Sequence, residues 1–488
     1  MPNMKRRQFL ALSAAYVLSA TACGAQNDSL ENVELEEYEA ATHVADYSYK
    51  LFDSDSIHEI DVRIAEADWE KLLASPREKE KFKVDITIDG EAFEEVAFST
   101  KGDSTLNGVL RMGGSNRFGF HVLFGQFKEG QSYHGLDSLS LNNLFGDATW
   151  MKDHISYKMF REMGVDAPLT SFARILINDR ELGLYMAVEN TGDAFHERAF
   201  AGSGVLYKPE AEPGRQMKEV EKVVDGETIA AMKFLPTTDP KGADLAYTDD
   251  SVDSYPDIFE HNVTEVEEAD NQQVIAALKG IADGKDLDTY VDTDEVIRYF
   301  AVHNYLQNFD SYSSFMVDNY ILHEVDGKLS LFPWDYNTAF GTFPFVEEWD
   351  AYGDGTELIN MGIDSPLLGI LDEERPMWKW ILDDETYLDA YHKELRQLLA
   401  RFFNDGALET EINRVYEMIL PFVADDPTAF YSEEEYMQAV ATLKDFCNLR
   451  AKSISRQLNG KLDTRSARQD PQKRVDASDL RVLTMGSL

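Results

Sequence analysis

Two aspartates lie in apolar segments of the sequence, where burial of a charged side chain costs free energy. Asp310 follows the apolar segment VIRYFAVHNYLQNF, and Asp335 lies within LSLFPWDYNTAFGTF, a run apolar and aromatic enough to predict burial. Because the chain has 89 Asp and Glu residues, a pair of acids means little without such an environment. An ionised carboxylate there costs free energy unless it is paired or binds a metal ion. A metal site is one interpretation, and aspartates satisfied by backbone N–H groups are the other.

A predicted hairpin brings these acids toward an asparagine. Two strand-like segments joined by the turn at 325–328 would carry Asn319 and Asp335 at neighbouring positions. Protein kinases build a catalytic base and a magnesium site from an acid before a hairpin, an amide on its first strand and an acid after its second. The order of Asp310, Asn319 and Asp335 therefore favours a functional site over two structural aspartates.

The elements that would position these residues change type along the chain. In the first part, Ile60–Ile64 and Phe82–Ile88 alternate apolar and polar residues as half-buried strands do, and Asp89-Gly90 is a turn signal. One helix is predicted from Met151 to Met163, with Gly164 as its stop. Further strands are predicted around 93–99, 117–124, 172–178 and 182–188.

The second part of the chain has the period of helices. Asp292 and Glu295 form a capping pattern before an apolar stripe. Two more stripes run from Tyr387 to Phe402 and from Tyr436 to Cys447, and Cys447 is predicted to be packed core. Strands followed by helices predict an α+β fold.

Composition limits the classes of partner. The 488 residues include 46 Lys and Arg against 89 Asp and Glu, which gives a net charge of −43. Such a field repels phosphate backbones and makes nucleic acid an unsuitable partner. With 43% apolar residues the chain can bury a large core, and its two cysteines provide no disulfide framework.

Both ends of the chain differ from the body. Residues 1–23 are predicted to be a signal peptide, since Arg6-Arg7 resembles a twin-arginine export signal and an imperfect lipobox precedes Cys23. This predicts export to the periplasm, cell surface or exterior, with a possible lipid anchor on Cys23. Residues 24–50 are predicted to be an acidic linker, and 460–488 a disordered tail.

Eleven short motifs follow one another in an order that resembles a known family. They are Thr100–Thr105, Leu139–Asn143, Asp147, Gly164-Val165, Ile177-Asn178, Gly183–Glu189, Gly204–Lys208, Asn308–Ser311, Asn319-Tyr320, Pro333–Asp335 and Phe340-Gly341. In this order they resemble the CotH kinases, atypical secreted or surface-associated kinases. The resemblance implies a protein-kinase-like bilobal fold over 51–459. Its parts would be a mixed β/α N-terminal lobe (about 51–208), a variable region (209–290) and a mainly helical C-terminal lobe (291–459).

The resemblance also implies roles for individual residues. Asp310 would orient or deprotonate the acceptor hydroxyl, and Asp335 would hold Mg²⁺ or Mn²⁺ with ATP. Asn319 and Asn337 would add neutral oxygens to that ion, although the family more often has Asp at the position of Asn337. The basic candidates for phosphate contacts are Lys101, Arg117 and Lys208, and Glu189 would stand at the edge of the adenine site.

The implied function is an exported, monomeric kinase that transfers the ATP γ-phosphate to Ser or Thr hydroxyls of a protein, or to itself. Two alternatives remain open at this level. A CotH-like adhesin or pseudokinase would keep the fold without turnover. A secreted glycan-binding or glycan-cleaving module would use paired carboxylates in an aromatic cleft.

Overall fold

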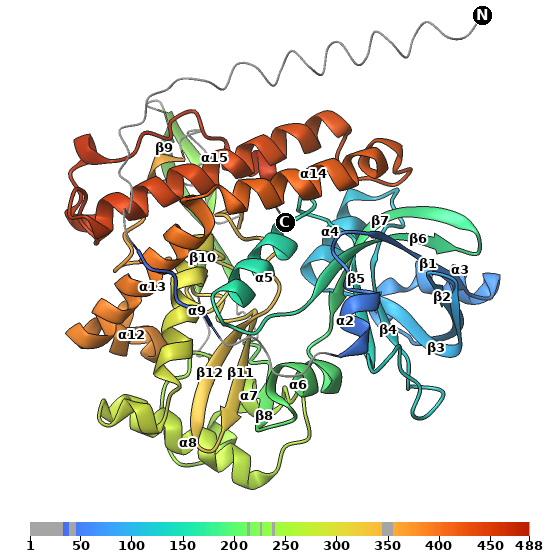
Figure 1. Ribbon diagram of the computed structural model, residues 1–488, viewed down its shortest axis with the longest axis horizontal. Coiled ribbons are helices and arrows are strands. Elements are labelled where there is room, and N and C mark those ends of the chain that lie inside the picture. The colour runs from blue at the N-terminus through green and yellow to red at the C-terminus, as the bar shows by residue number, and fades with distance from the viewer. Residues whose placement is uncertain are drawn as a thin grey trace, which may run out of the picture.

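A strand-rich part and a helical part lie side by side in the computed structural model (Figure 1). The structure describes residues 33–38, 45–211, 215–224, 227–236, 240–343 and 355–487. The predicted signal peptide, with Cys23, lies outside these ranges.

Seven strands of the first part close into a barrel in the order β1–β2–β3–β4–β5–β7–β6. Closure comes from the parallel pairing of β1 with β6, while the other neighbours are antiparallel. The strands are β1 (Ile57–Arg63), β2 (Phe82–Ile88), β3 (Glu91–Lys101), β4 (Gly119–Leu123), β5 (Ser138–Asn142), β6 (Thr170–Ile177) and β7 (Arg180–Glu189).

The barrel confirms the predicted strands but corrects the predicted architecture. Apolar side chains that alternate along β1 and β2 fill the interior, as their period of two requires. Asp89 and Gly90 both have positive φ in the turn after β2, as predicted for a D-G turn. The mixed α and β character is confirmed, whereas a plain kinase-like N-terminal lobe is not, because pairing of β1 with β6 closes the sheet.

Helices flank the barrel strands and connect them to the second part. Among them, α5 confirms the helix predicted before Gly164 and is buried on nearly every side. These helices are α2 (Asp46–Lys50), α3 (Glu66–Ala74), α4 (Ser104–Met112), α5 (Lys152–Glu162) and α6 (Asp193–Phe200).

The region 209–290 has more regular structure than its irregular sequence suggested. A Glu267–Asp270 capping box starts helix α8, and the helix buries an apolar stripe that includes Val274 and Leu278. The elements from β8 onward are β8 (Val205–Tyr207), β9 (Arg215–Val224), β10 (Glu227–Pro236), α7 (Pro256–Phe259) and α8 (Glu268–Asp283).

The predicted hairpin is present as β11 (Tyr320–Val325) and β12 (Lys328–Pro333). Its turn residues Asp326 and Gly327 have positive φ. Strand β8 adds to the other edge of β11 and gives the sheet order β12–β11–β8. Helix α9 (Thr293–Leu306) precedes the hairpin, and Asp292 caps it by accepting from the Glu295 N–H at 3.1 Å, as predicted.

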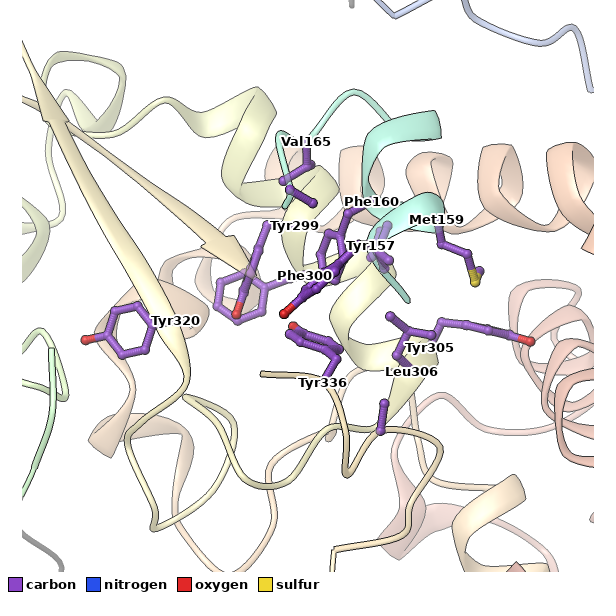
Figure 2. Close-up of a cluster of buried hydrophobic side chains, with 14 of the residues drawn as sticks. Tyr157, Met159, Phe160, Val165, Tyr299, Phe300, Tyr305, Leu306, Tyr320 and Tyr336 are labelled. Atoms are coloured by element: carbon purple, nitrogen blue, oxygen red, sulfur yellow. The ribbon is translucent and has the colours of Figure 1, made fainter. Parts of the chain in front are cut away.

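The second part is a set of helices around an aromatic core. Figure 2 shows Tyr157 and Phe160 of α5 close to Tyr299 and Phe300 of α9 and to Tyr336 after β12. The C-terminal helices are α11 (Thr356–Ile359), α12 (Pro376–Asp383), α13 (Glu385–Phe403), α14 (Ala407–Asp425) and α15 (Glu433–Leu458). Short 3₁₀ turns are η1 (Pro76–Glu78), η2 (Val252–Ser254), η3 (Leu287–Thr289) and η5 (Asp372–Glu374).

Helix α15 carries the cysteine that was predicted to be packed core. Cys447 on α15 is a buried free thiol, as predicted for core. In the ranges that the structure describes, no helix combines the length and apolarity of a membrane span.

Both ends of the body are more ordered than their composition suggested. In the predicted linker, the Tyr38 hydroxyl donates to Glu394 at 2.5 Å and Tyr47 is buried. The predicted disordered tail holds η6 (Ser466–Arg468), η7 (Pro471–Lys473) and η8 (Val482–Met485), and Leu462, Val475 and Met485 are buried. These isolated apolar residues have no helical or strand period, so the sequence pattern gave no sign that they dock.

Candidate active site

A polar cleft opens where the ends of β3 and β5 face the start of α5 and the segment after β12. It is lined by Lys101, Gly102, Thr105, Gly119, Asn142, Asn143, Leu144, Phe145, Asp147, Asp153, Asp335 and Asn337. Three of the residues selected from the sequence, Lys101, Asp335 and Asn337, therefore meet in one place. The cleft also contains Asn142 and Asp153, for which no role was predicted.

Lys101 supplies the positive charge of this cleft. It ends β3, and its Nζ donates to Asn142 Oδ1 at 2.6 Å and lies 6.0 Å from the centre of the Trp334 ring. Burial lowers the pKa of Lys101, and the nearby carboxylates of Asp335 and Asp153 oppose that shift. An ammonium group thus lies within the electrostatic reach of two carboxylates.

Hydrogen bonds to its backbone fix the position of Asp335, whereas one oxygen of its carboxylate has no hydrogen-bond partner. It has a φ of +49°, which Asp and Asn tolerate better than most residues. Its N–H donates to the Tyr157 hydroxyl at 2.9 Å, and its carbonyl accepts from Asn308 Nδ2 at 3.1 Å. Asp335 Oδ1 and Asn337 Oδ1 are both buried and lack a hydrogen-bond partner. Buried polar atoms are rarely left in this state, so these two oxygens suit a ligand.

Asp153 adds a second carboxylate beside Asp335. It lies in the first turn of α5, where Oδ1 accepts from the Tyr336 N–H at 2.7 Å and Oδ2 from Asn142 Nδ2 at 3.3 Å. Burial raises the pKa of Asp153, and the negative charge of Asp335 raises it further. Asp153 was not predicted as a site residue, and its position in the first turn of a predicted helix was the one sequence signal that could have identified it.

The donor set fits a hard divalent cation. Two carboxylates and the Asn337 amide oxygen are the oxygen ligands that Mg²⁺ prefers, and Mg²⁺ usually completes its shell with water and substrate phosphates. Within the described part of the chain, no group of three His, Cys, Asp or Glu residues gathers into an all-protein metal cage. The residues therefore suit a cation that arrives with a phosphate ligand.

Asn308 connects Asp310 to Asp335 of this cleft, because its side chain is hydrogen-bonded to the backbone of both residues. Asn308 Oδ1 accepts from the Asp310 N–H at 3.3 Å, while Asn308 Nδ2 holds the Asp335 carbonyl. Asn319 Nδ2 donates to the Asp310 carbonyl at 2.7 Å, so its amide supports the Asp310 backbone. Asn319 does not line the cleft with Asp335.

Lys208 directly follows β8 and is not among the residues that line the cleft. Its Nζ pairs with Glu210. Burial lowers the pKa of Lys208, but the attraction of Glu210, Asp318 and Asp335 outweighs burial, and the pKa is raised overall. Burial raises the pKa of Asp318 to about 6.

Arg117 and Glu189 are structural residues, which corrects their predicted roles. Arg117 is fully buried and forms a salt bridge with Asp426 at 2.7 Å. Glu189 is equally buried; Arg198 donates to it twice at 2.8 Å and Tyr47 once at 2.6 Å. Because their charged atoms are already engaged, neither side chain is available to a nucleotide.

Together, the barrel, the helical part and the cleft define a mixed α/β protein with a polar cleft that contains carboxylate and amide oxygens. The chain belongs to the CotH kinase protein family, whose model matches residues 100–454. It is similar to the inner spore coat protein H of Bacillus subtilis (strain 168), with 23% identity over 315 residues that cover 63% of this chain and 74% of the relative. The resemblance seen in the motifs is confirmed. Strands β1 and β2 and the segment after 454 lie outside the matched range.

Proposed function

We propose that this chain is an exported CotH-type kinase that transfers the γ-phosphate of ATP to protein hydroxyls with Mg²⁺ or Mn²⁺. The observation that carries the proposal is the pair of buried, unpartnered oxygens, Asp335 Oδ1 and Asn337 Oδ1, in one cleft with Lys101. Family membership supports the reaction class.

In this proposal, different residues of the cleft bind the cation and the phosphates of the nucleotide. Asp335, Asn337 and Asp153 would hold the divalent cation, which neutralises charge on the phosphates when it is bound. Lys101 would contact a phosphate oxygen, and its hydrogen bond to Asn142 keeps the ammonium group aimed into the cleft. Phosphoryl transfer depends mainly on positioning and charge stabilisation, which is what these residues offer.

Asp310 would act on the acceptor. Its backbone is fixed by Asn308 and Asn319, and Asn308 also holds the backbone of Asp335. This connection sets the spacing between the group that orients the acceptor hydroxyl and the group that holds the cation. The acceptor would be a Ser or Thr hydroxyl of a protein, or of the chain itself.

Export is the second part of the proposal. It is supported by the basic start of the chain, by Arg6-Arg7 and by the small residues before Cys23. A lipid on Cys23 would tether the enzyme to a membrane, and the net charge of −43 argues against nucleic acid as a partner.

Labelled phosphate transfer tests this function. The mature chain is incubated with ATP labelled at the γ-phosphate and with Mg²⁺ or Mn²⁺, and phosphorylated residues are mapped by mass spectrometry. We expect label on Ser or Thr, and none with Asp310→Asn or Asp335→Asn. Binding of ATP without any transfer by the parent chain would instead favour a non-catalytic adhesin.

A further inference from the structure

The loop between β5 and α5, residues 143–151, forms one wall of the cleft. Asp147 holds the shape of this loop, since its carboxylate accepts from the N–H groups of Thr149 at 2.9 Å, Trp150 at 3.1 Å and Lys152 at 2.9 Å. The loop leads directly into the first turn of α5, which carries Asp153. The position of the loop therefore sets the position of a cleft carboxylate.

Residues 482–487 dock on this loop. The Ala148 N–H donates to the Met485 carbonyl at 3.0 Å, and the Met485 side chain is fully buried. The Thr484 hydroxyl is 2.9 Å from that of Thr442, which anchors the segment on α15. Figure 1 shows the C-terminal end of the chain beside α5. This segment lies beyond the residues that the family model matches.

Lys152 joins the docked segment to the 143–151 loop and to the segment after β12. It is fully buried, and its Nζ donates to the Gly146 carbonyl at 3.1 Å, the Gly486 carbonyl at 3.3 Å and the Thr342 hydroxyl at 2.8 Å. A buried ammonium group is costly without such partners. These three bonds tie the 143–151 loop to residues 482–487 and to the segment that follows Asp335 in the chain.

We propose that residues 482–487 are part of the active-site framework and that Lys152 is a positioning residue for Asp153. The docked segment holds the 143–151 loop, and the loop holds Asp153 beside Asp335 so that both carboxylates face one cation. What the cleft binds rests on the proposed function, whereas the docking of the segment does not.

A pair of glycine variants tests this proposal. Gly486 has a φ of +85°, and an added Cβ would lie 2.7 Å from the Gly146 carbonyl oxygen and 2.8 Å from the Ala148 nitrogen. Gly486→Ala should therefore push the segment away from the loop. Gly460→Ala is the matched control, because Gly460 has a φ of +68° and open space around its Cβ position.

Two measurements on the full chain separate positioning from plain stability. Hydrogen exchange of peptides covering 146–153 should speed up by about tenfold or more in Gly486→Ala relative to Gly460→Ala. With a fixed concentration of a non-hydrolysable ATP analogue to supply the phosphate ligands, the half-saturating Mn²⁺ concentration, measured from the enhancement of water-proton relaxation by protein-bound Mn²⁺, should rise by about tenfold or more, as is usual when the support of a metal ligand is lost. Lys152→Met should show both changes. If Lys152→Met does not fold, the comparison of Gly486→Ala with Gly460→Ala alone tests the proposal.

Unchanged exchange in Gly486→Ala would overturn the docking. Faster exchange with unchanged Mn²⁺ binding would overturn the positioning role and leave the segment merely structural. If the parent chain binds Mn²⁺ but transfers no phosphate, the proposed function fails alone. If it binds no Mn²⁺, the positioning role of Lys152 and the proposed function fail together, and the docking of the segment is judged by hydrogen exchange alone.

Discussion

Replacing Asp335 by Asn should abolish phosphoryl transfer and leave the fold intact. The backbone of Asp335 has a φ of +49°, which Asn adopts readily, and both backbone hydrogen bonds, to Tyr157 and Asn308, are independent of the carboxylate. The variant removes one negative charge from a cleft where the pKa of Asp153 is already raised by burial and by Asp335. Its free energy of unfolding should therefore equal or exceed that of the parent chain when metal is absent.

The expected loss of activity follows from the charge that is removed. A cation that stabilises charge on transferring phosphates contributes several kcal/mol. At about 1.4 kcal/mol per factor of ten, loss of this contribution lowers the transfer rate on the order of a thousandfold or more. Lys101 and Asp153 would remain in the cleft, so weak nucleotide binding should persist while its dependence on Mg²⁺ is lost.

Asp326→Asn is the matched control for this variant. Asp326 also has a positive φ, of 53°, and it lies exposed in the β11–β12 turn, away from the residues that line the cleft. Transfer of labelled γ-phosphate, ATP titration with and without Mg²⁺, and thermal unfolding are measured for both variants. Equal transfer rates for Asp335→Asn and Asp326→Asn would refute the assignment of Asp335.

Three further variants test other parts of the account. Asp310→Asn should bind Mg²⁺ and ATP within about threefold of the parent chain and yet transfer no phosphate, and impaired binding would contradict its role on the acceptor. Arg117→Met should lower the free energy of unfolding by about 3–5 kcal/mol, because it leaves the buried carboxylate of Asp426 without its cation, and denaturant unfolding measures this loss. Burial lowers the pKa of His303 to about 3, so protonation favours the unfolded chain and stability should fall as the pH drops below about 6.5. Between pH 7 and pH 4, the free energy of unfolding should change less with pH in His303→Gln than in the parent chain. An equal pH dependence in the two proteins would contradict this role of His303.

The sequence predicted the local elements well because each has its own period or turn signal. Alternating residues marked β1 and β2, and an apolar stripe with a stop at Gly164 marked α5. Closure of the barrel was not predictable, because it depends on pairing between β1 and β6, which lie more than a hundred residues apart. The docking of residues 482–487 was missed for the same reason, since its contacts are all with distant segments.

The residues of the candidate site could also be predicted only in part. Asp335 could be selected because a carboxylate in an aromatic run is costly unless it is paired or binds a metal ion, whereas Asn337 was selected through the family resemblance. Arg117 and Glu189 could not be judged from the sequence, since a basic or acidic residue on a strand can face a ligand or a buried partner. Only the structure shows that Asp426 and Arg198 already neutralise them.

Titration of the full chain with ATP, in the presence of Mg²⁺ and again with a chelator, tests the central claim most directly. The claim is that the cleft between Lys101 and Asp335 binds a nucleotide through a divalent cation. We predict heat of binding with one site per chain when Mg²⁺ is present, and weak or undetectable binding with the chelator or in Asp335→Asn. Absence of binding under both conditions, or binding of equal strength under both, would contradict the claim.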